Sequence, residues 1–294
     1  MRPIHNIKEF HRPTHLKEAL ELLSGLGNKT GLIAGGTDLL PRRQGGRTGI
    51  TRPCLVDILG LGLNYIKKTK THILIGAATD INALASSPIF LSSPYNVLSE
   101  AALAHSTVTL RNRATLGGNL CNASPHADLA LPLLALDAIL ICEGSNGKKT
   151  LNLKEFFTGP HCTVLEPGEI LIEIRIPLIR ENSGTNFIKQ TRQHTAIDMA
   201  LVNVAACLCL KDGICTSARI ALGSAGPFPF RAKKAEALLE KTTVDEDIIK
   251  KAALLAAEES SPIDDIRATA AYRKKMIPLL VRQSLEKSLE RSRQ

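Results

Sequence analysis

The chain has 294 residues, of which 44% are hydrophobic and 22% charged, and it carries a formal net charge of +9 at neutral pH. This composition is typical of a globular protein with one large or several small domains, and no apolar run is long enough for a membrane span. The basic residues lie in separate clusters and only 3% of the residues are aromatic, which argues against a base-stacking surface for nucleic acid. A polyanionic cofactor or an acidic protein partner fits the charge at least as well.

Along the first half of the chain, the apolar spacing predicts short helices and strands in alternation. We expect helices at 14–23, 80–85, 94–104 and 128–136, and strands at 31–34, 54–58, 65–66, 72–76, 138–142 and 169–177. Gly25, Gly27 and Gly31 miss the Rossmann spacing by one residue and follow a helix, so we interpret them as a helix C-cap and turn. No Walker A motif is present, which argues against an ordinary ATPase.

A polar segment at 179–185 marks a boundary, because the pattern changes beyond it. Residues 202–210 and 214–222 flank a turn that contains Asp212 and Gly213, which predicts a long β-hairpin. Helical spacing follows at 231–240, 245–259 and 270–288. A hairpin followed by helices indicates an α+β domain.

The seven cysteines are odd in number and none has C-x-x-C spacing, so we expect reduced thiols rather than disulfides or an iron–sulfur cluster. Cys207 and Cys209 share one face of a predicted strand, which favours core packing over metal binding. The N-terminus lacks the apolar core of a signal peptide, and we expect a cytoplasmic protein. His11 and His15 have the spacing of a helical zinc pair, but Pro13 breaks such a helix, so we predict no metal ligand and keep zinc there as a minor alternative.

Two glycine pairs carry the strongest functional signal, because apolar residues crowd both sides of each pair. Gly35 and Gly36 lie within the segment 32–40, and Gly117 and Gly118 lie within 111–120. A missing Cβ lets ligand oxygens approach backbone N–H groups, and successive N–H groups can form a concave anion site. Short polar side chains stand at the same places: Thr37, Asp38, Thr115 and Asn119. The pairs therefore predict a ligand with several phosphate or hydroxyl groups, with a plain strand-to-helix turn as the alternative for the first pair.

Residues 34–38 (AGGTD) and 114–119 (ATLGGN), followed by 123–128 (ASPHAD), resemble the FAD-binding (medium) subunit of the molybdenum hydroxylases. That family includes xanthine dehydrogenase, carbon monoxide dehydrogenase and hydroxybenzoyl-CoA reductase. The predicted strand at 169–177, followed at family-like spacing by 187–190 (FIKQ), adds a third motif in the right order. The resemblance covers nearly the whole chain.

The resemblance implies an α+β fold with two α/β FAD-binding subdomains (PCMH-like), at 1–57 and 58–180, followed by a C-terminal α+β domain at 186–294. It implies an oxidoreductase subunit with non-covalent FAD. Molybdopterin and [2Fe–2S] clusters are expected only on partners, namely a large molybdenum subunit and a small [2Fe–2S] subunit. Electrons would pass from those clusters through FAD to an acceptor such as NAD. The alternatives are a stand-alone FAD-dependent oxidoreductase and, in a different class, a basic nucleic-acid-binding protein.

The resemblance also implies which residues contact FAD. In the first loop they are Ile33, Ala34, Gly35, Gly36, Thr37, Asp38 and Leu39, and in the second loop they are Ala114, Thr115, Gly117, Gly118, Asn119, Cys121 and Asn122. Outside the loops, the resemblance implies that Asp128 contacts FAD, that Leu171 lies near the flavin ring and that Lys189 lies near its pyrimidine edge. A fixed cation there would stabilise the negative charge of reduced flavin. No residue is predicted to act as a catalytic acid or base.

Several of these residues have a second interpretation. Asp38 or Asp128 could cap a following helix. Lys189 could be a solvated strand lysine. His105 stands roughly where some relatives place an aromatic residue beside the flavin, but a helix-end histidine is the simpler interpretation. Arg111 and Arg113 would either steer phosphates or only flank the second loop.

Overall fold

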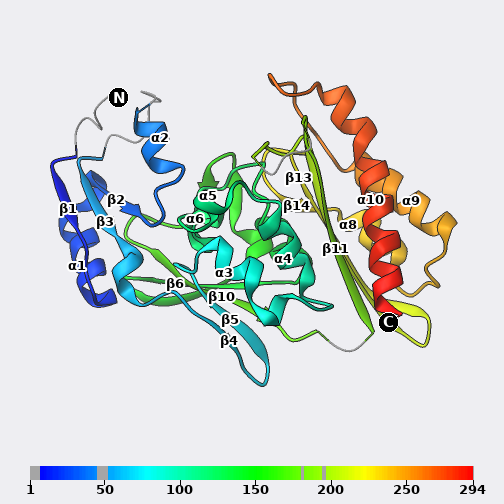
Figure 1. Ribbon diagram of the computed structural model, residues 1–294, viewed down its shortest axis with the longest axis horizontal. Coiled ribbons are helices and arrows are strands. Elements are labelled where there is room, and N and C mark those ends of the chain that lie inside the picture. Colours follow the sequence, from blue (N-terminus) through cyan, green and yellow to red (C-terminus); the bar gives the residue numbers. More distant parts are fainter. Residues whose placement is uncertain (1–6, 45–51, 180–181, 194–196, 294) are drawn as a thin grey trace.

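The computed structural model describes residues 7–44, 52–179, 182–193 and 197–293 (Figure 1). The N-terminal residues on which the signal-peptide argument rests, and residues 180–181 of the expected boundary, lie outside this part. Helices and mainly antiparallel sheets are mixed along the chain, as the α+β prediction requires. Within the described residues, no helix combines the length and the apolar character needed to cross a bilayer.

The N-terminal part is a small layer of parallel strands with one helix packed on it. Its elements are β1 (Glu9–His11), α1 (Leu16–Leu26), η1 (Gly27–Lys29), β2 (Thr30–Ile33), α2 (Leu39–Gln44) and β3 (Cys54–Asp57), and its strand order is β1-β3-β2. Gly27 has φ +53° and donates its N–H to Leu23 O, which confirms the predicted helix C-cap. Buried Ala19 and Leu23 of α1 pack with Val56 and with Ile172 from the next sheet, so the two layers share one apolar cluster.

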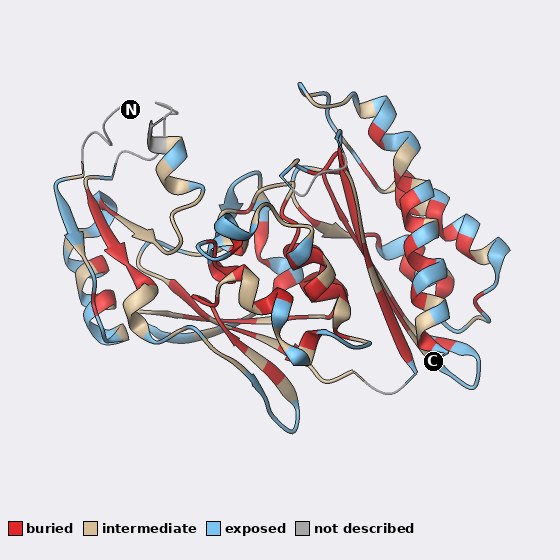
Figure 2. Ribbon diagram, in the orientation of Figure 1, coloured by how far each residue is buried: buried red, intermediate tan, exposed pale blue. Residues whose placement is uncertain are grey.

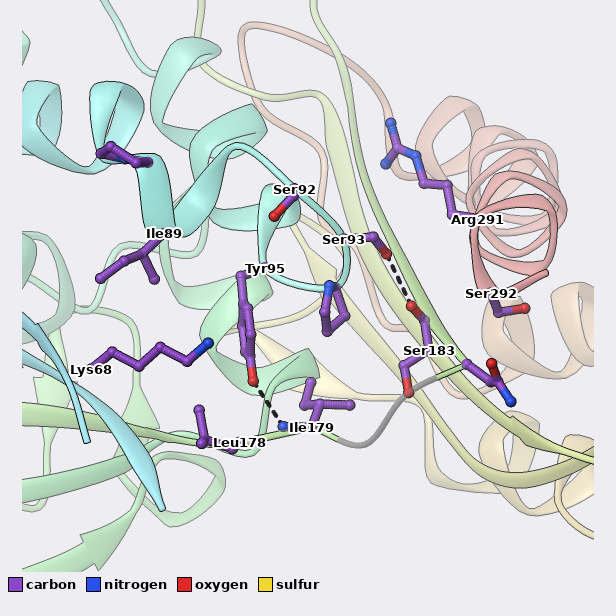
Figure 3. Close-up of a pocket in the computed structure, with 13 residues that line it drawn as sticks. Lys68, Ile89, Ser92, Ser93, Tyr95, Leu178, Ile179, Ser183, Arg291 and Ser292 are labelled. Atoms are coloured by element: carbon purple, nitrogen blue, oxygen red, sulfur yellow. Dashed lines mark hydrogen bonds between the residues drawn. The ribbon is translucent and has the colours of Figure 1, made fainter. Parts of the chain in front are cut away.

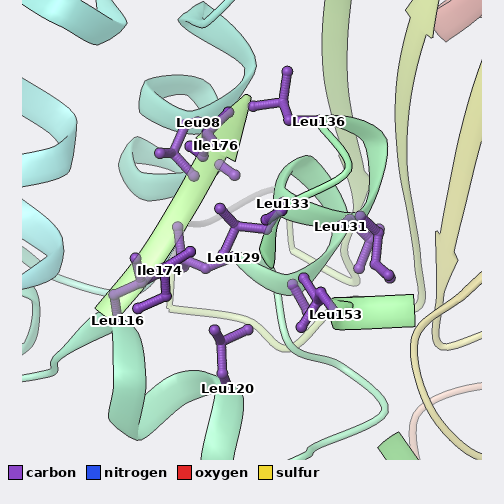
Figure 4. Close-up of a cluster of buried hydrophobic side chains, with 14 of the residues drawn as sticks. Leu98, Leu116, Leu120, Leu129, Leu131, Leu133, Leu136, Leu153, Ile174 and Ile176 are labelled. Carbon is purple, nitrogen blue, oxygen red and sulfur yellow. The ribbon is translucent and has the colours of Figure 1, made fainter. Parts of the chain in front are cut away.

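The middle part is a five-stranded antiparallel sheet covered by short helices. Its strands, in the order β4-β5-β10-β6-β7, are β4 (Ile66–Lys68), β5 (His72–Gly76), β10 (Ile170–Pro177), β6 (Ile139–Gly144) and β7 (Gly147–Asn152). The helices are η2 (Ile58–Leu61), α3 (Ile81–Ser86), η3 (Pro88–Phe90), α4 (Asn96–Leu103), α5 (Val108–Arg111), α6 (Leu116–Cys121), α7 (Ala130–Ala135) and η4 (Leu153–Glu155), and β8 (Phe157–Gly159) pairs with β9 (Cys162–Thr163). Leucines of α4, α6 and α7 meet Ile174 and Ile176 of β10 in the core (Figure 4).

The C-terminal part is a four-stranded antiparallel sheet with three helices on one face. The strands, in spatial order, are β11 (Ser183–Gln190), β12 (Val202–Lys211), β13 (Ile214–Gly223) and β14 (Phe230–Arg231), and the helices are α8 (Lys233–Leu239), α9 (Glu246–Glu258) and α10 (Ala270–Ser292). The predicted hairpin is confirmed: Asp212 and Gly213 both have positive φ, at 51° and 79°, as a tight hairpin turn requires.

The central strand β12 is buried on both faces (Figure 2). Val204 and Ala206 belong to the cluster beneath α8, α9 and α10, whereas Ala205 and Cys207 belong to the core of the middle part. This follows from the alternation of side chains along a strand. The prediction that Cys207 serves core packing is confirmed, because its side chain is fully buried there. Phe187 of β11 and Ala221 of β13 belong to the same middle core, so one face of the sheet joins the middle and C-terminal parts.

Strand β11 begins at Ser183, inside the polar segment that was expected to form a boundary. This strand needs a glycine at position 184, because a Cβ on Gly184 would lie 1.9 Å from Ser288 O of α10. The helix thus approaches the strand backbone to backbone. Buried Ser284 and Ser288 face the sheet and donate their hydroxyls to carbonyl oxygens, Ser284 to Asn186 O at 3.2 Å and Ser288 to its own helix at 2.8 Å.

Candidate functional site

The two glycine loops lie backbone against backbone, although about eighty residues separate them. The first loop connects β2 to α2, and the second leads into α6. A Cβ on Gly35 would lie 1.8 Å from Arg113 O and 3.0 Å from Ala114 Cα, so only glycine fits at this position. The structure therefore brings together the two loops that the resemblance implied for one ligand.

The first loop has the free N–H groups that an anion site needs. Gly36 adopts φ +71°, and the loop carbonyls Gly36 O and Asp38 O accept from Leu40 N and Arg42 N as α2 begins. Within the described part of the chain, no protein atom accepts a hydrogen bond from the backbone N–H groups of residues 35–38. Successive unpaired N–H groups in such a turn form a concavity that binds phosphate oxygens.

The second loop is built differently, and the expected N–H cradle is wrong there. The N–H groups of Leu116, Gly117 and Gly118 bond to Thr79 O at 2.9 Å, to Ala77 O at 2.8 Å and to Thr115 Oγ1 at 3.1 Å. The reason is local: Thr115 is the N-cap of α6, and the residues after β5 pair with the loop like an added strand. The hydroxyl of Thr115 thus serves the protein's own backbone.

The second loop nevertheless carries an unfilled hydrogen-bonding position. Asn119 is half-buried, and its Oδ1 has no hydrogen-bond partner among the described residues. Gly118 beside it is exposed, whereas Gly117 packs so closely that a Cβ would lie 2.7 Å from Ala77 O. Buried polar atoms without partners are rare, and an absent ligand is one standard reason for them. The loop therefore contains one buried, unpaired acceptor, and its N–H groups at 116–118 are already used by the protein.

Arg42 connects the two loops and was missed by the sequence argument. Its Nη1 lies 3.3 Å from Asp38 Oδ2 and 3.4 Å from Asn122 Oδ1. Asn122 also accepts at its backbone oxygen from the ring of His161 at 2.8 Å. The available signal was the i, i+4 spacing of Asp38 and Arg42 at the start of a helix. The structure thus gives Asp38 an ion pair, and adds a cation where the two loops meet.

Asp128 lies at the centre of a buried polar cluster with Lys189. Its Oδ2 is 2.8 Å from Lys189 Nζ and 3.3 Å from His105 Nδ1, and its Oδ1 accepts from Asn203 Nδ2 at 2.9 Å. The side chains of Asp128 and Lys189 are only 5% and 6% exposed, and Lys189 also donates to Ala104 O at 3.0 Å. The solvated-lysine interpretation is therefore wrong.

The helix-cap interpretation of Asp128 is also wrong, because Leu129 is the N-cap of α7 and no side chain caps that helix. His105 lies just beyond the end of α4, so it is a helix-end histidine that also belongs to the cluster. Asn203 was missed. Its signal was a polar amide inside the apolar strand β12, where a buried polar group needs partners.

The remaining predicted residues occupy several different places. Arg111 is buried and donates to Leu103 O at 3.2 Å and Ser106 O at 2.9 Å, so it holds the preceding turn rather than facing a ligand. Arg113 is exposed. Leu171 is a core residue of β10, where it stands opposite Cys142. In the first loop, Ile33 is the last residue of β2 and Ala34 follows it, while Thr37 and Leu39 lie at the start of α2. In the second loop, Ala114 is buried just before α6, and Cys121 is the exposed last residue of that helix.

A hollow of about 640 Å³ lies elsewhere, between η3, the residues that follow β10, the start of β11 and the end of α10 (Figure 3). Tyr95 Oη accepts from Ile179 N at 2.8 Å at its base, and Ser93 Oγ donates to Ser183 O at 2.9 Å. None of its lining residues belongs to either glycine loop or to the Asp128 cluster. The hollow is therefore separate from the candidate cofactor site.

Comparison with known families and structures adds to this geometry. Residues 5–179 match the family described as "FAD binding domain in molybdopterin dehydrogenase", and residues 186–288 match "CO dehydrogenase flavoprotein C-terminal domain". The chain is 34% identical over 281 residues to the 6-hydroxypseudooxynicotine dehydrogenase complex subunit alpha of Paenarthrobacter nicotinovorans, covering 95% of this chain and 93% of the relative. It is 31% identical to the carbon monoxide dehydrogenase medium chain of Afipia carboxidovorans, covering 97% and 98%.

Solved structures agree with these matches. A carbon monoxide dehydrogenase from Hydrogenophaga pseudoflava that lacks the Mo-pyranopterin moiety superposes with a TM-score of 0.92 at 32% identity, covering 96% of this chain and 97% of that chain. Quinoline 2-oxidoreductase from Pseudomonas putida superposes with a TM-score of 0.87 at 28% identity, covering 97% of each. The similarity extends over both the middle and the C-terminal parts.

Proposed function

Because the chain belongs to the family of FAD-binding medium subunits of the molybdenum hydroxylases, we propose that it passes electrons from [2Fe–2S] clusters of a partner subunit through FAD to an acceptor such as NAD. The chain is an oxidoreductase flavoprotein subunit of such a complex, and its own cofactor is FAD. We propose that the molybdopterin and the iron–sulfur clusters of the complex sit on other subunits. We propose a large molybdenum subunit and a small [2Fe–2S] subunit as its partners.

The residues of the two loops suit the two polar parts of FAD. We propose that the unpaired N–H groups of residues 35–38, together with Arg42, bind the pyrophosphate. The unpaired Oδ1 of Asn119 would accept from a ribityl hydroxyl. When bound, FAD supplies redox chemistry that accepts electrons singly and delivers them in pairs. The observation that carries the proposal is the set of free N–H groups beside the backbone of the second loop.

Lys189 supports the electron-transfer role because two protein partners hold its ammonium group in place before any ligand binds. An ammonium group has three N–H donors, and two of them are used by Asp128 Oδ2 and Ala104 O. One donor remains for a ligand atom. A cation held by two partners does not need to reorganise when negative charge develops beside it, which is how preorganised groups stabilise charge most effectively. We propose that this remaining N–H faces the flavin.

The cofactor proposal is tested with glycine variants of the full chain. We expect Gly36→Val and Gly118→Val to abolish FAD retention. Gly36 has φ +71°, and a Cβ on the exposed Gly118 would lie 2.8 Å from Thr115 Oγ1, the cap of α6, where a cofactor would approach. FAD released from the purified protein by denaturation is measured by absorbance. Gly25→Ala in α1 is the matched control, because its Cβ would have no heavy atom within 4 Å. Full FAD occupancy in both valine variants would contradict the proposal.

A third variant separates ligand binding from folding. Asn119→Ala removes an oxygen that has no partner in the protein, so the unfolding midpoint of the FAD-free protein should not fall. Loss of one hydrogen bond to the cofactor should weaken FAD binding by about tenfold. Unchanged affinity, measured by flavin fluorescence quenching, would exclude Asn119 from the site.

The electron acceptor is tested in the assembled complex. The chain is coexpressed with the proposed large and small subunits, and the purified complex is reduced anaerobically with dithionite. Addition of NAD should then produce NADH absorbance. Reoxidation by dioxygen without NADH formation would contradict the NAD step, and substrate turnover by the isolated chain would favour the stand-alone oxidoreductase instead.

A further inference from the structure

The outer edge of the N-terminal sheet gathers three different metal-binding side chains. Glu9 and His11 lie two residues apart on β1, so they point to the same face of the strand. Strand β1 pairs in parallel with β3, and Glu9 stands opposite Cys54 in that register. The donor atoms are close: His11 Nε2 is 3.2 Å from Glu9 Oε2, Cys54 Sγ is 4.0 Å from the same oxygen, and all three lie within 4.8 Å of one another.

A hollow of about 460 Å³ opens beside Glu9 and His11, between β1 and α1, and Cys54 is buried behind them, outside its lining. It is lined by Glu9 and His11 from the strand and by Glu18 and Glu21 from the helix, with Leu22 behind them. Among the described residues that line it, none is a lysine or an arginine. Glu21 pairs with Lys17 at 3.9 Å, whereas no lysine or arginine among the described residues pairs with Glu9 or Glu18. Two carboxylates without a basic partner thus face one space, and their charge attracts a cation.

We propose that Glu9, His11 and Cys54 bind a zinc-type divalent cation, with a water molecule or Glu18 as the fourth ligand. One sulfur, one nitrogen and one oxygen are the three donor types that zinc accepts, whereas magnesium and calcium prefer oxygen ligands alone. Bond lengths of zinc place tetrahedral ligand atoms about 3.3–3.8 Å apart, so the present cluster would contract by about an ångström. As the metal–sulfur bond forms, the thiol proton passes to solvent.

The site is independent of the cofactor and of the histidine pair considered from the sequence. Strand β3 separates β1 from β2, and only β2 leads into the first glycine loop (Figure 1). His15 is not a partner of His11, because it is the N-cap of α1 and its Nδ1 contacts Thr14 Oγ1 at 3.0 Å. The strand pairing, rather than a helix face, supplies the ligand set.

Cobalt titration of the chelator-treated, full-length protein tests the proposal. We expect one equivalent of Co²⁺ to give visible d–d bands at wavelengths beyond flavin absorption, and Zn²⁺ to abolish them by displacement. Glu9→Gln and His11→Gln should each weaken binding by about tenfold or more. Their side chains are 55% and 35% exposed, so these variants should fold normally. His15→Gln is the matched control and should bind like wild type.

The sulfur ligand is tested by X-ray absorption at the zinc edge. One sulfur at about 2.3 Å is expected in the wild type and in Cys162→Ser, which removes an exposed cysteine elsewhere, and no sulfur is expected in Cys54→Ser. A wild-type shell of nitrogen and oxygen alone would overturn the proposal, as would cobalt binding that survives in both His11→Gln and Glu9→Gln. FAD content should be equal in all variants, which separates this site from the proposed cofactor function.

Discussion

At the scale of single residues, the cluster around Asp128 shows which parts of a site a sequence can predict. Asp128 and Lys189 were predicted because they belong to motifs with a recognisable order. Asn203 and Arg42 were not, because nothing in their own neighbourhood indicates a partner 75 or 80 residues away. An amide in an apolar strand signals that some partner exists without saying which one. In the same way, the N–H groups of Leu116 and Gly117 bond to Thr79 and Ala77, which lie far away in the sequence.

Lys189→Met should destabilise the protein by about 3 kcal/mol, because it leaves the buried carboxylate of Asp128 without its main cation. The double variant Lys189→Met, Asp128→Asn should recover most of that loss. Chemical unfolding of the two single variants and the double variant measures the coupling between the side chains. Equal and additive losses would show that the pair is not coupled. In the FAD-loaded protein, Lys189→Met should also move the flavin midpoint potential to a more negative value.

At the scale of elements, helices and strands with clear periodicity were predicted at the right places. The hairpin β12–β13 and the helix α10 follow from local signals, namely a D-G turn and a long run of helical spacing. Strand β11 did not follow, since Ser183 and Gly184 look like a linker until α10 packs on them. The domain limits at 57/58 and at 180/186 remain predictions, because they concern folding units rather than single elements.

The start of α10 predicts an acid sensitivity. Asp265 accepts from the backbone N–H groups of Arg267 and Ala268 and pairs with Arg267 and with the buried Arg273 at 2.8 Å. Burial opposes the charged carboxylate, but these hydrogen bonds and charges outweigh it and lower the pKa of Asp265 to about 2. A carboxyl whose pKa is lower in the folded state stabilises that state above its ordinary pKa and loses the effect as the pH falls through the folded value.

We therefore expect up to about 2 kcal/mol of stability to be lost between about pH 4 and pH 2 through this group. Asp265→Asn should be less stable at neutral pH, and its free energy of unfolding should change less across that acid interval. Urea unfolding at a series of pH values makes the comparison. Parallel pH profiles for the variant and the wild type would rule out the assigned role of Asp265.

At the scale of the whole molecule, Asp137 fastens the middle part to the C-terminal sheet. It follows α7 in a left-handed conformation with φ +51°, and its carboxylate accepts from Arg219 of β13 and Arg231 of β14. Arg231 continues the network to buried Glu236 of α8 at 2.7 Å. Charged groups from three elements and from the turn after α7 thus meet at the junction, beside the apolar contact of α7 with β12 and β13.

Asp137→Asn should cost about 1–2 kcal/mol, because it removes a partly buried anion from between two arginines while asparagine still tolerates the left-handed backbone. Lys233→Ala is the control: Lys233 pairs with the same network from an exposed position and should change stability by less than about 0.5 kcal/mol. Thermal unfolding of both variants tests this. If the two lose equally little, the network does not contribute to the junction.

The burial of β12 on both faces limits how the chain can be divided. Helix α4 packs on β11, and α7 packs on β12 and β13. The C-terminal sheet therefore covers the core of the middle part on one side. A fragment that stopped at residue 179 would leave those helices with bare apolar sides, and such surfaces aggregate in water. A chimera that exchanges the C-terminal part between related dehydrogenases should therefore fold only if the C-terminal sheet is transferred together with α4 and α7, which pack on it.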